Sequence, residues 1–134
     1  MIAWKRDQKH GIDVWCGMIL GFDNDCSDIV EMQRAFLQDN NILHAMVGML
    51  SAIPPTPLYQ RLLAEGRLGK KEASRYGTNV IPKNLSREEL KNGYVDLMRY
   101  FYDIEPYFER LNGLILDPEF RIAPKGDYWK SRRP

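Results

Sequence analysis

The chain has 134 residues, 44% of them hydrophobic, and its 19 basic and 18 acidic residues give a formal net charge of +1. Near-neutral charge argues against a dedicated nucleic-acid-binding protein, because such proteins carry a strong basic excess. No stretch approaches the roughly 20 apolar residues of a membrane span, and no apolar run follows a basic start as in a signal peptide. Composition therefore predicts a soluble, cytoplasmic, globular protein.

The first half of the chain predicts a βαβ unit. Residues 13–20 form a nearly continuous apolar run of strand length, typical of a strand covered on both faces, as in parallel sheets. A helical pattern follows, with Asp25 as the expected N-cap and Asp28 in the first turn, and it ends near Asn40. A second apolar run covers residues 42–53, so we expect two parallel strands. The predicted core face of the helix comprises Ile29, Met32, Phe36 and Leu37, with Val30 and Ala35 beside it.

The sequence pattern after the βαβ unit predicts helices and no further strand. Prolines at 54, 55 and 57 break the chain, and Thr56 is expected to cap a short helix that stops at Gly66. The predicted buried side of this helix is Leu58, Tyr59, Leu62 and Leu63. A polar connector runs over residues 69–84.

Two further helices are predicted beyond the connector. Ser86 and Glu89 form a capping box ahead of a stripe with offsets of four, three and four residues, namely Leu90, Tyr94, Leu97 and Phe101. Asp103 is expected to cap the last helix, and Pro106 is tolerated in its first turn. The apolar residues expected in that helix are Ile104, Tyr107, Phe108, Leu111, Leu114 and Ile115.

The predicted organisation has three parts: a βαβ-α piece over 1–68, a helical C-terminal domain over 69–118, and a loosely ordered basic tail over 119–134. A solvated tail, strapped to the body by Phe120, Tyr128 and Trp129, is favoured over a peptide or RNA contact. Two parallel strands alone leave both outer edges unpaired. Either other segments add strands, or two copies join edge to edge, or the unit is a piece of a larger α/β barrel.

Few side chains in the sequence indicate a catalytic or metal-binding role. Cys16 and Cys26 match no CxxC motif, and we expect each to be a small core or near-surface residue. A calcium loop is suggested by Asp23, Asn24, Asp25 and Asp28, yet the loop position that needs Gly is Asp28 and the position that needs Glu is Arg34, so a capping turn is preferred. His44 is expected to be a hydrogen-bonded core histidine rather than a catalytic one. The aromatic residues at helical spacing are expected to lie in the core or at a subunit interface.

Several short strings between residues 17 and 83 belong to a pattern that spans about residues 11–116. The first is Gly17-Met18-Ile19-Leu20-Gly21, continued by Phe22-Asp23-Asn24-Asp25 and Asp28-Ile29. The others are Ala52-Ile53-Pro54-Pro55-Thr56-Pro57-Leu58-Tyr59, Arg61-Leu62, Glu65-Gly66-Arg67-Leu68 and Thr78-Asn79-Val80-Ile81-Pro82-Lys83. Together they resemble the C-terminal third of radical SAM proteins that carry an N-terminal cobalamin-binding domain. The resemblance implies a late strand of a partial (β/α) barrel, a second strand leading to the proline turn, and a small helical region that closes the chain.

The resemblance also implies cofactors. The intact relative would use a [4Fe-4S] cluster, S-adenosylmethionine and cobalamin, with Gly17, Ile19 and Gly21 letting S-adenosylmethionine approach the strand. This chain departs from the pattern: it lacks the CxxxCxxC cluster motif and the cobalamin domain, and Pro55 stands where the family usually has Gly. We therefore expect no cofactor, catalytic residue or metal site in this chain itself.

The sequence thus predicts a fragment or truncated relative of such an enzyme, inactive alone, whose intact relative would modify an unactivated carbon, often by methylation. The alternative is a free-standing interaction or dimerisation module. The expected partners are a second copy of the chain or missing upstream domains.

Overall fold

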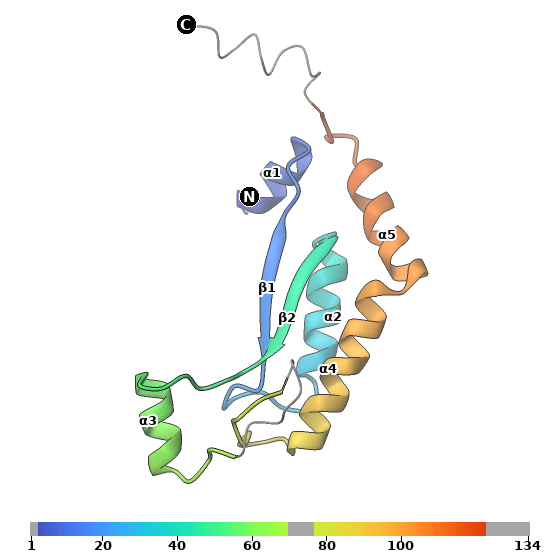
Figure 1. Cartoon of the computed structure of the whole chain (residues 1–134). Helices are drawn as coiled ribbons and strands as arrows, with labels where there is room; N and C mark the ends of the chain where they lie inside the picture. The colour runs from blue at the N-terminus through green and yellow to red at the C-terminus, as the bar shows by residue number, and fades with distance from the viewer. Residues whose placement is uncertain (1–2, 70–76, 123–134) are drawn as a thin grey trace, which may run out of the picture.

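The computed structural model describes residues 3–69 and 77–122, and from its first strand onward its elements follow the predicted order (Figure 1). Helix α1 (Ala3–Lys9) precedes strand β1 (Trp15–Leu20), helix α2 (Ile29–Asp39) and strand β2 (His44–Met49). Helices α3 (Pro57–Ala64), α4 (Arg87–Tyr102) and α5 (Ile104–Ile115) follow. Among the described residues, β1 and β2 pair in parallel, in register from the Trp15–His44 pair to the Leu20–Met49 pair. The predicted α/β class, with a parallel βαβ unit and a helical second half, is confirmed.

The main core lies between one face of this ribbon and helices α2 and α4 (Figure 1). Its buried residues are Leu20, Leu37, Ile42, Ala45, Leu90, Tyr94, Leu97 and Phe101. Helix α4 contributes its entire predicted stripe. The predicted capping box is also formed, because the Ser86 hydroxyl accepts from the Glu89 amide at 3.1 Å while the Glu89 carboxylate accepts from the Ser86 amide at 2.7 Å.

Two predictions for the βαβ unit are wrong in the described chain. β1 is covered on one face only, because the helices pack on the side of Leu20 and no described element covers the other side. In α2, Met32 and Phe36 are exposed, since the helix turns its Leu37 side to the ribbon. The second apolar run is a strand only over 44–49, and its remainder forms the connections on either side.

Helix α3 begins and ends as predicted. The Thr56 hydroxyl accepts from the Tyr59 amide at 3.3 Å, and Gly66 takes the left-handed φ of +66° that glycine tolerates. Leu62 is buried in a second cluster with Ala52 and Val80. Leu63 is exposed, contrary to prediction, because this one-sided contact buries a narrower face than the sequence suggested.

The residue of α5 that is fully buried is Arg110, which was not predicted. Its Nη2 donates to the carbonyl of Phe101 at 2.5 Å, and its guanidinium carbon lies 4.6 Å from the Phe101 ring centroid. This carbonyl belongs to the last turn of α4, where the helix dipole favours a positive charge. Burial lowers the pKa of the Arg110 guanidinium. The predicted buried residues Ile104, Phe108 and Ile115 are instead exposed.

The ends of the described chain lie together. Lys9 forms an ion pair with Glu119, and the Arg121 amide donates to the Lys9 carbonyl at 2.6 Å. The rest of the predicted tail, with Tyr128 and Trp129, lies outside the described residues. An antiparallel bridge between Leu68 and Val80 crosses the predicted boundary at 68/69, and the division into three parts stays a prediction. Within the described chain, no helix has the length and apolar character needed to cross a membrane.

Candidate functional site

The open face of the ribbon is the surface made by Trp15, Gly17 and Ile19 of β1 with their partners His44, Met46 and Gly48 of β2. Side chains alternate along a strand, so these residues lie opposite the side that packs on the helices. Trp15 is 66% exposed and Met46 is 70% exposed. A Cβ added at Gly17 or Gly48 would find nothing within 4 Å. The open face is therefore a largely apolar surface with open space above its two glycines.

The predicted ligand residues divide between this face and its edge. Gly17 and Ile19 lie together on the open face. Gly21 lies one residue beyond the strand and has a φ of +103°, and a Cβ there would come within 3.0 Å of the Leu90 side chain. Gly21 thus turns the chain at the carboxyl end of β1, the edge where parallel sheets place ligands. The role of these residues with S-adenosylmethionine stays a prediction.

The turn after β1 is held by a carboxylate within it. Oδ2 of Asp25 accepts from the amides of Gly21 and Phe22 at 2.7 and 3.0 Å. Asp28, not Asp25, is the N-cap of α2, and its side chain makes no cap hydrogen bond. The prediction of Asp25 as the helix cap is therefore wrong, because its carboxylate is used by donors that precede it in the chain.

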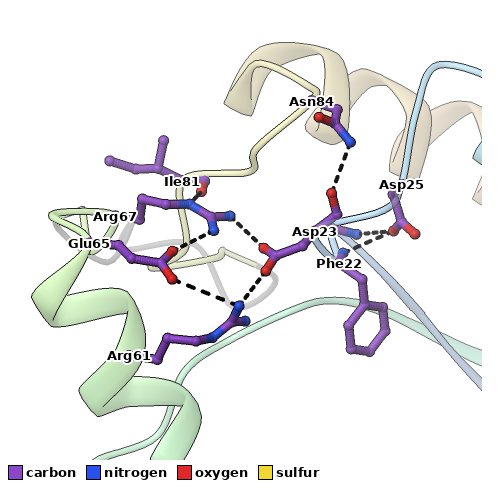
Figure 2. Close-up of polar contacts among 9 residues, drawn as sticks. Phe22, Asp23, Asp25, Arg61, Glu65, Arg67, Ile81 and Asn84 are labelled. Atoms are coloured by element: carbon purple, nitrogen blue, oxygen red, sulfur yellow. Dashed lines mark hydrogen bonds and ion pairs between the residues drawn. The ribbon is translucent and has the colours of Figure 1, made fainter.

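Asp23, in the same turn, reaches a different part of the chain (Figure 2). Its two carboxylate oxygens accept separately from Arg61, at 2.6 Å, and from Arg67, at 2.7 Å. The Asn84 amide donates to the Asp23 carbonyl at 2.8 Å. The two arginines hold the pKa of Asp23 below its usual range, and the hydrogen bond to Asp23 raises the pKa of Arg67.

These contacts explain the acidic cluster without a metal. Asp23 is committed to two arginines and Asp25 to backbone amides. Residues 3–69 and 77–122 contain no group of three or more His, Cys, Asp or Glu side chains that could hold a metal ion. The sequence pointed to a turn here but missed Arg61 and Arg67, because partners 38 and 44 residues away leave no local signal.

His44 is not a core histidine, contrary to prediction. It lies half-exposed on the open face, and its ring stacks on Trp15 with 5.0 Å between the centroids. Oδ2 of Asp13 approaches a nitrogen of each ring, at 2.7 Å from the Trp15 indole nitrogen, which donates to it, and at 3.0 Å from Nδ1 of His44. This group stands at the amino end of the strands, away from the turn at Gly21.

The two cysteines lie in different surroundings, and Cys26 adjoins the turn, where its Sγ lies 3.8 Å from the Asn84 amide nitrogen. Cys16 is half-buried on the helix-facing side of β1, and burial raises the pKa of its thiol. Cys26 is exposed and borders a cleft of about 420 Å³ between the first turns of α2 and α4. Leu20, Val30 and Leu90 of the main core form its apolar part, and charged and polar side chains of α2 and α4, among them Arg34 and Glu89, line the rest. Both cysteines are free thiols, as expected for core or near-surface residues.

Residues 56–130 match the family DUF4070, described as a domain of unknown function. The chain belongs to the DUF4070 family. The match begins at the cap of α3, so Arg61, Arg67 and Asn84 fall within the DUF4070 region, whereas the open face and the turn at Asp23 precede it.

Two curated proteins are similar to this DUF4070 chain. A protein named hopanoid C-2 methylase, from Rhodopseudomonas palustris, is 41% identical over 60 residues, which cover 45% of this chain and 11% of the methylase. An uncharacterized methyltransferase from Synechocystis sp. is 29% identical over 106 residues, which cover 76% of this chain and 20% of that protein. The chain thus matches only a small part of each relative's length. No solved structure matches it significantly.

Proposed function

We propose that the chain is the C-terminal part of a longer enzyme of the cobalamin-dependent radical SAM class, and that it has no catalytic activity alone. The intact enzyme would cleave S-adenosylmethionine reductively and modify an unactivated carbon, often by methylation. Similarity to two proteins that are named for methyl transfer supports this proposal. Their greater length is consistent with the rest of the enzyme lying outside this chain.

The observation that carries the proposal is the open face. Among residues 3–69 and 77–122 the parallel ribbon has two strands, with one face and both edges uncovered. Such a ribbon is an incomplete sheet, because apolar parallel strands are ordinarily covered on both sides. Trp15, Ile19 and Met46 are exposed on this face. Neighbouring exposed apolar side chains mark a surface that contacts another part of a protein or a ligand. Further strands of the same polypeptide, closing a partial barrel, would place this face toward the barrel interior.

The residues of this chain fit S-adenosylmethionine and do not fit a [4Fe-4S] cluster. The open space above Gly17 and Gly48 could admit S-adenosylmethionine close to the backbone, and Ile19 offers an apolar contact for its adenine ring. A [4Fe-4S] cluster needs several thiolates, and the sequence has only Cys16 and Cys26. We therefore assign the cluster and the cobalamin to the remainder of the enzyme.

The reading frame upstream of codon 1 tests this proposal. Sequencing the genomic DNA there should reveal an in-frame CxxxCxxC motif in the same open frame. An in-frame stop codon immediately before Met1, with no such motif joined to the chain, would overturn the proposal and favour the alternative below.

The alternative is a free-standing interaction module that dimerises or binds another protein. The exposed apolar residues of α5, Ile104, Phe108 and Ile115, favour it, because an amphipathic helix with an uncovered apolar side is a common docking surface. Light scattering over a concentration series tests the dimerisation of the isolated chain, and the upstream reading frame distinguishes the two proposals. A mass of two chains supports self-association, whereas a mass of one chain at high concentration argues against it.

A further inference from the structure

The turn Gly21–Asp25 is joined to the DUF4070 region through one side chain. Asp23 presents Oδ2 to Arg61 of α3 and Oδ1 to Arg67, which follows α3 (Figure 2). Arg61 and Arg67 both also approach Glu65, with distances of 3.9 and 2.9 Å. Two arginines and two carboxylates thus form a closed network between the end of β1 and the end of α3.

Arg67 is the rigid member of this network. Its Nε donates to the Ile81 carbonyl at 3.0 Å, its Nη1 to Glu65 and its Nη2 to Asp23. A planar guanidinium whose donors all have different partners is held in one orientation, as a flexible lysine would not be. The Arg67 side chain is 15% exposed and that of Asp23 is 26% exposed, so the pair is better shielded from solvent than an ordinary surface ion pair.

The turn itself has a local and a distant support. Asp25 fixes the amides of Gly21 and Phe22 within the turn. Asp23 fixes the whole turn against α3, and Asn84 adds a contact to its backbone from the segment before α4. The local support depends only on residues 21–25, whereas every partner of the distant support lies in the DUF4070 region.

We infer that Asp23 and Arg67 are positioning residues, which set the conformation of the turn at the ligand end of β1 from the DUF4070 region. The identity of the ligand at that end rests on the proposed function, but the coupling of the turn to α3 does not. The DUF4070 region then helps to fix the conformation of the turn that borders the open face. Because such coupling is reciprocal, a ligand that orders the turn also strengthens the docking of α3.

Amide hydrogen exchange measured by NMR tests this inference in the whole chain. Asp23→Asn and Arg67→Gln should each accelerate exchange at Gly21 and Phe22 about tenfold or more, because losing the distant support opens the turn locally. Exchange at Leu97, in the middle of α4, should stay unchanged. Asp96→Asn, which removes an exposed pair with Arg99 at 3.8 Å, is the matched control and should change none of these rates.

The double variant Asp23→Asn/Arg67→Gln shows whether the two residues act through each other. We expect it to exchange no faster at Gly21 than the faster single variant, because residues in one network are not additive. Unchanged rates at Gly21 and Phe22 in both single variants would overturn the inference. So would equal acceleration at Leu97, which indicates general destabilisation, or single effects that multiply in the double variant.

These outcomes are independent of the proposed function. The exchange measurement uses neither ligand nor cluster, so its failure removes the positioning role and leaves the enzyme class to the upstream reading frame. A reading frame without the cluster motif would remove the enzyme class and leave the coupling of Asp23 to Arg67 to the exchange rates.

Discussion

Helices α4 and α5 carry apolar stripes with the same spacing and opposite burial. The α4 stripe, Leu90, Tyr94, Leu97 and Phe101, is buried in the main core. The α5 stripe, Ile104, Phe108, Leu111 and Ile115, repeats the offsets of four, three and four, yet all but the partly buried Leu111 are exposed. Periodicity therefore identifies a helix and its apolar side, but it does not say whether a partner for that side is in the same chain.

The difference follows from what each helix has to pack against. α4 contacts both α2 and β2, whereas α5 contacts α4 across a short interface. The side of α5 that faces this interface carries Arg110, which binds the Phe101 carbonyl and stacks on the Phe101 ring. The Arg110 guanidinium occupies this position because it donates a hydrogen bond to a carbonyl at the end of α4 and contacts an aromatic ring there. The apolar stripe of α5 therefore faces away from α4.

Truncating one residue in each stripe should give very different losses in the free energy of unfolding. Leu97→Ala should lower the free energy of unfolding by about 2 to 5 kcal/mol, because Leu97 is 0% exposed and its removal leaves a cavity. Ile104→Ala is the matched control and should change it by less than about 0.5 kcal/mol, since Ile104 is 72% exposed. Urea unfolding followed by circular dichroism measures both.

Equal losses of unfolding free energy in the two variants would contradict the opposite burial of the two stripes. They would show that the isolated chain covers the α5 stripe, for instance by self-association, and the loss for Ile104→Ala should then grow with protein concentration.

The helix starts provide a second, smaller contrast. Ser86→Ala removes a side-chain cap that accepts from the Glu89 amide, and we expect a loss of about 1 kcal/mol. Asp103 occupies the N-cap of α5 without a side-chain cap hydrogen bond, so Asp103→Ala should cost clearly less. The same urea titrations measure this difference, and a larger loss for Asp103→Ala would contradict the assigned caps.

The smallest effect concerns the charge in the α4 capping box. Hydrogen bonds from the Ser86 amide and hydroxyl hold the pKa of Glu89 below its usual range. A depressed pKa means that the ionised carboxylate stabilises the fold above the unfolded pKa of about 4.3, and that this contribution disappears as the pH falls through the folded pKa. The difference in urea midpoint between wild type and Glu89→Gln should therefore shrink between pH 6 and pH 3. A difference that widens toward pH 3 would contradict this sign.

Local signals in the sequence predicted the elements well. The capping box at Ser86 and Glu89, the hydroxyl cap at Thr56 and the left-handed Gly66 each depend on neighbours within a few residues, and each is formed. The parallel pairing of β1 and β2 followed from an intervening helix, which such a connection requires. These features are decided by short-range chemistry that a single sequence contains.

Features decided by distant or missing partners could not be predicted in this way. The Asp23 network joins segments about 40 residues apart, and charged residues are so common that no pattern singles out Arg61 and Arg67. The apolar run that becomes β1 indicated two covered faces, and the open face of the ribbon shows that only one cover lies in the described chain. His44 was placed in the core for the same reason, because its strand neighbours are apolar.

The proposed enzyme has a ligand face in this chain and its cluster ligands elsewhere in a longer polypeptide. Anaerobic reconstitution of the purified chain with iron and sulfide, followed by iron analysis and a visible spectrum, tests this division. The account predicts no stoichiometric iron, and the same background in a Cys16→Ser/Cys26→Ser variant, because two free cysteines cannot supply three thiolates to one cluster. Stoichiometric iron that is lost in the double cysteine variant, with the absorption of a thiolate-ligated cluster, would contradict it.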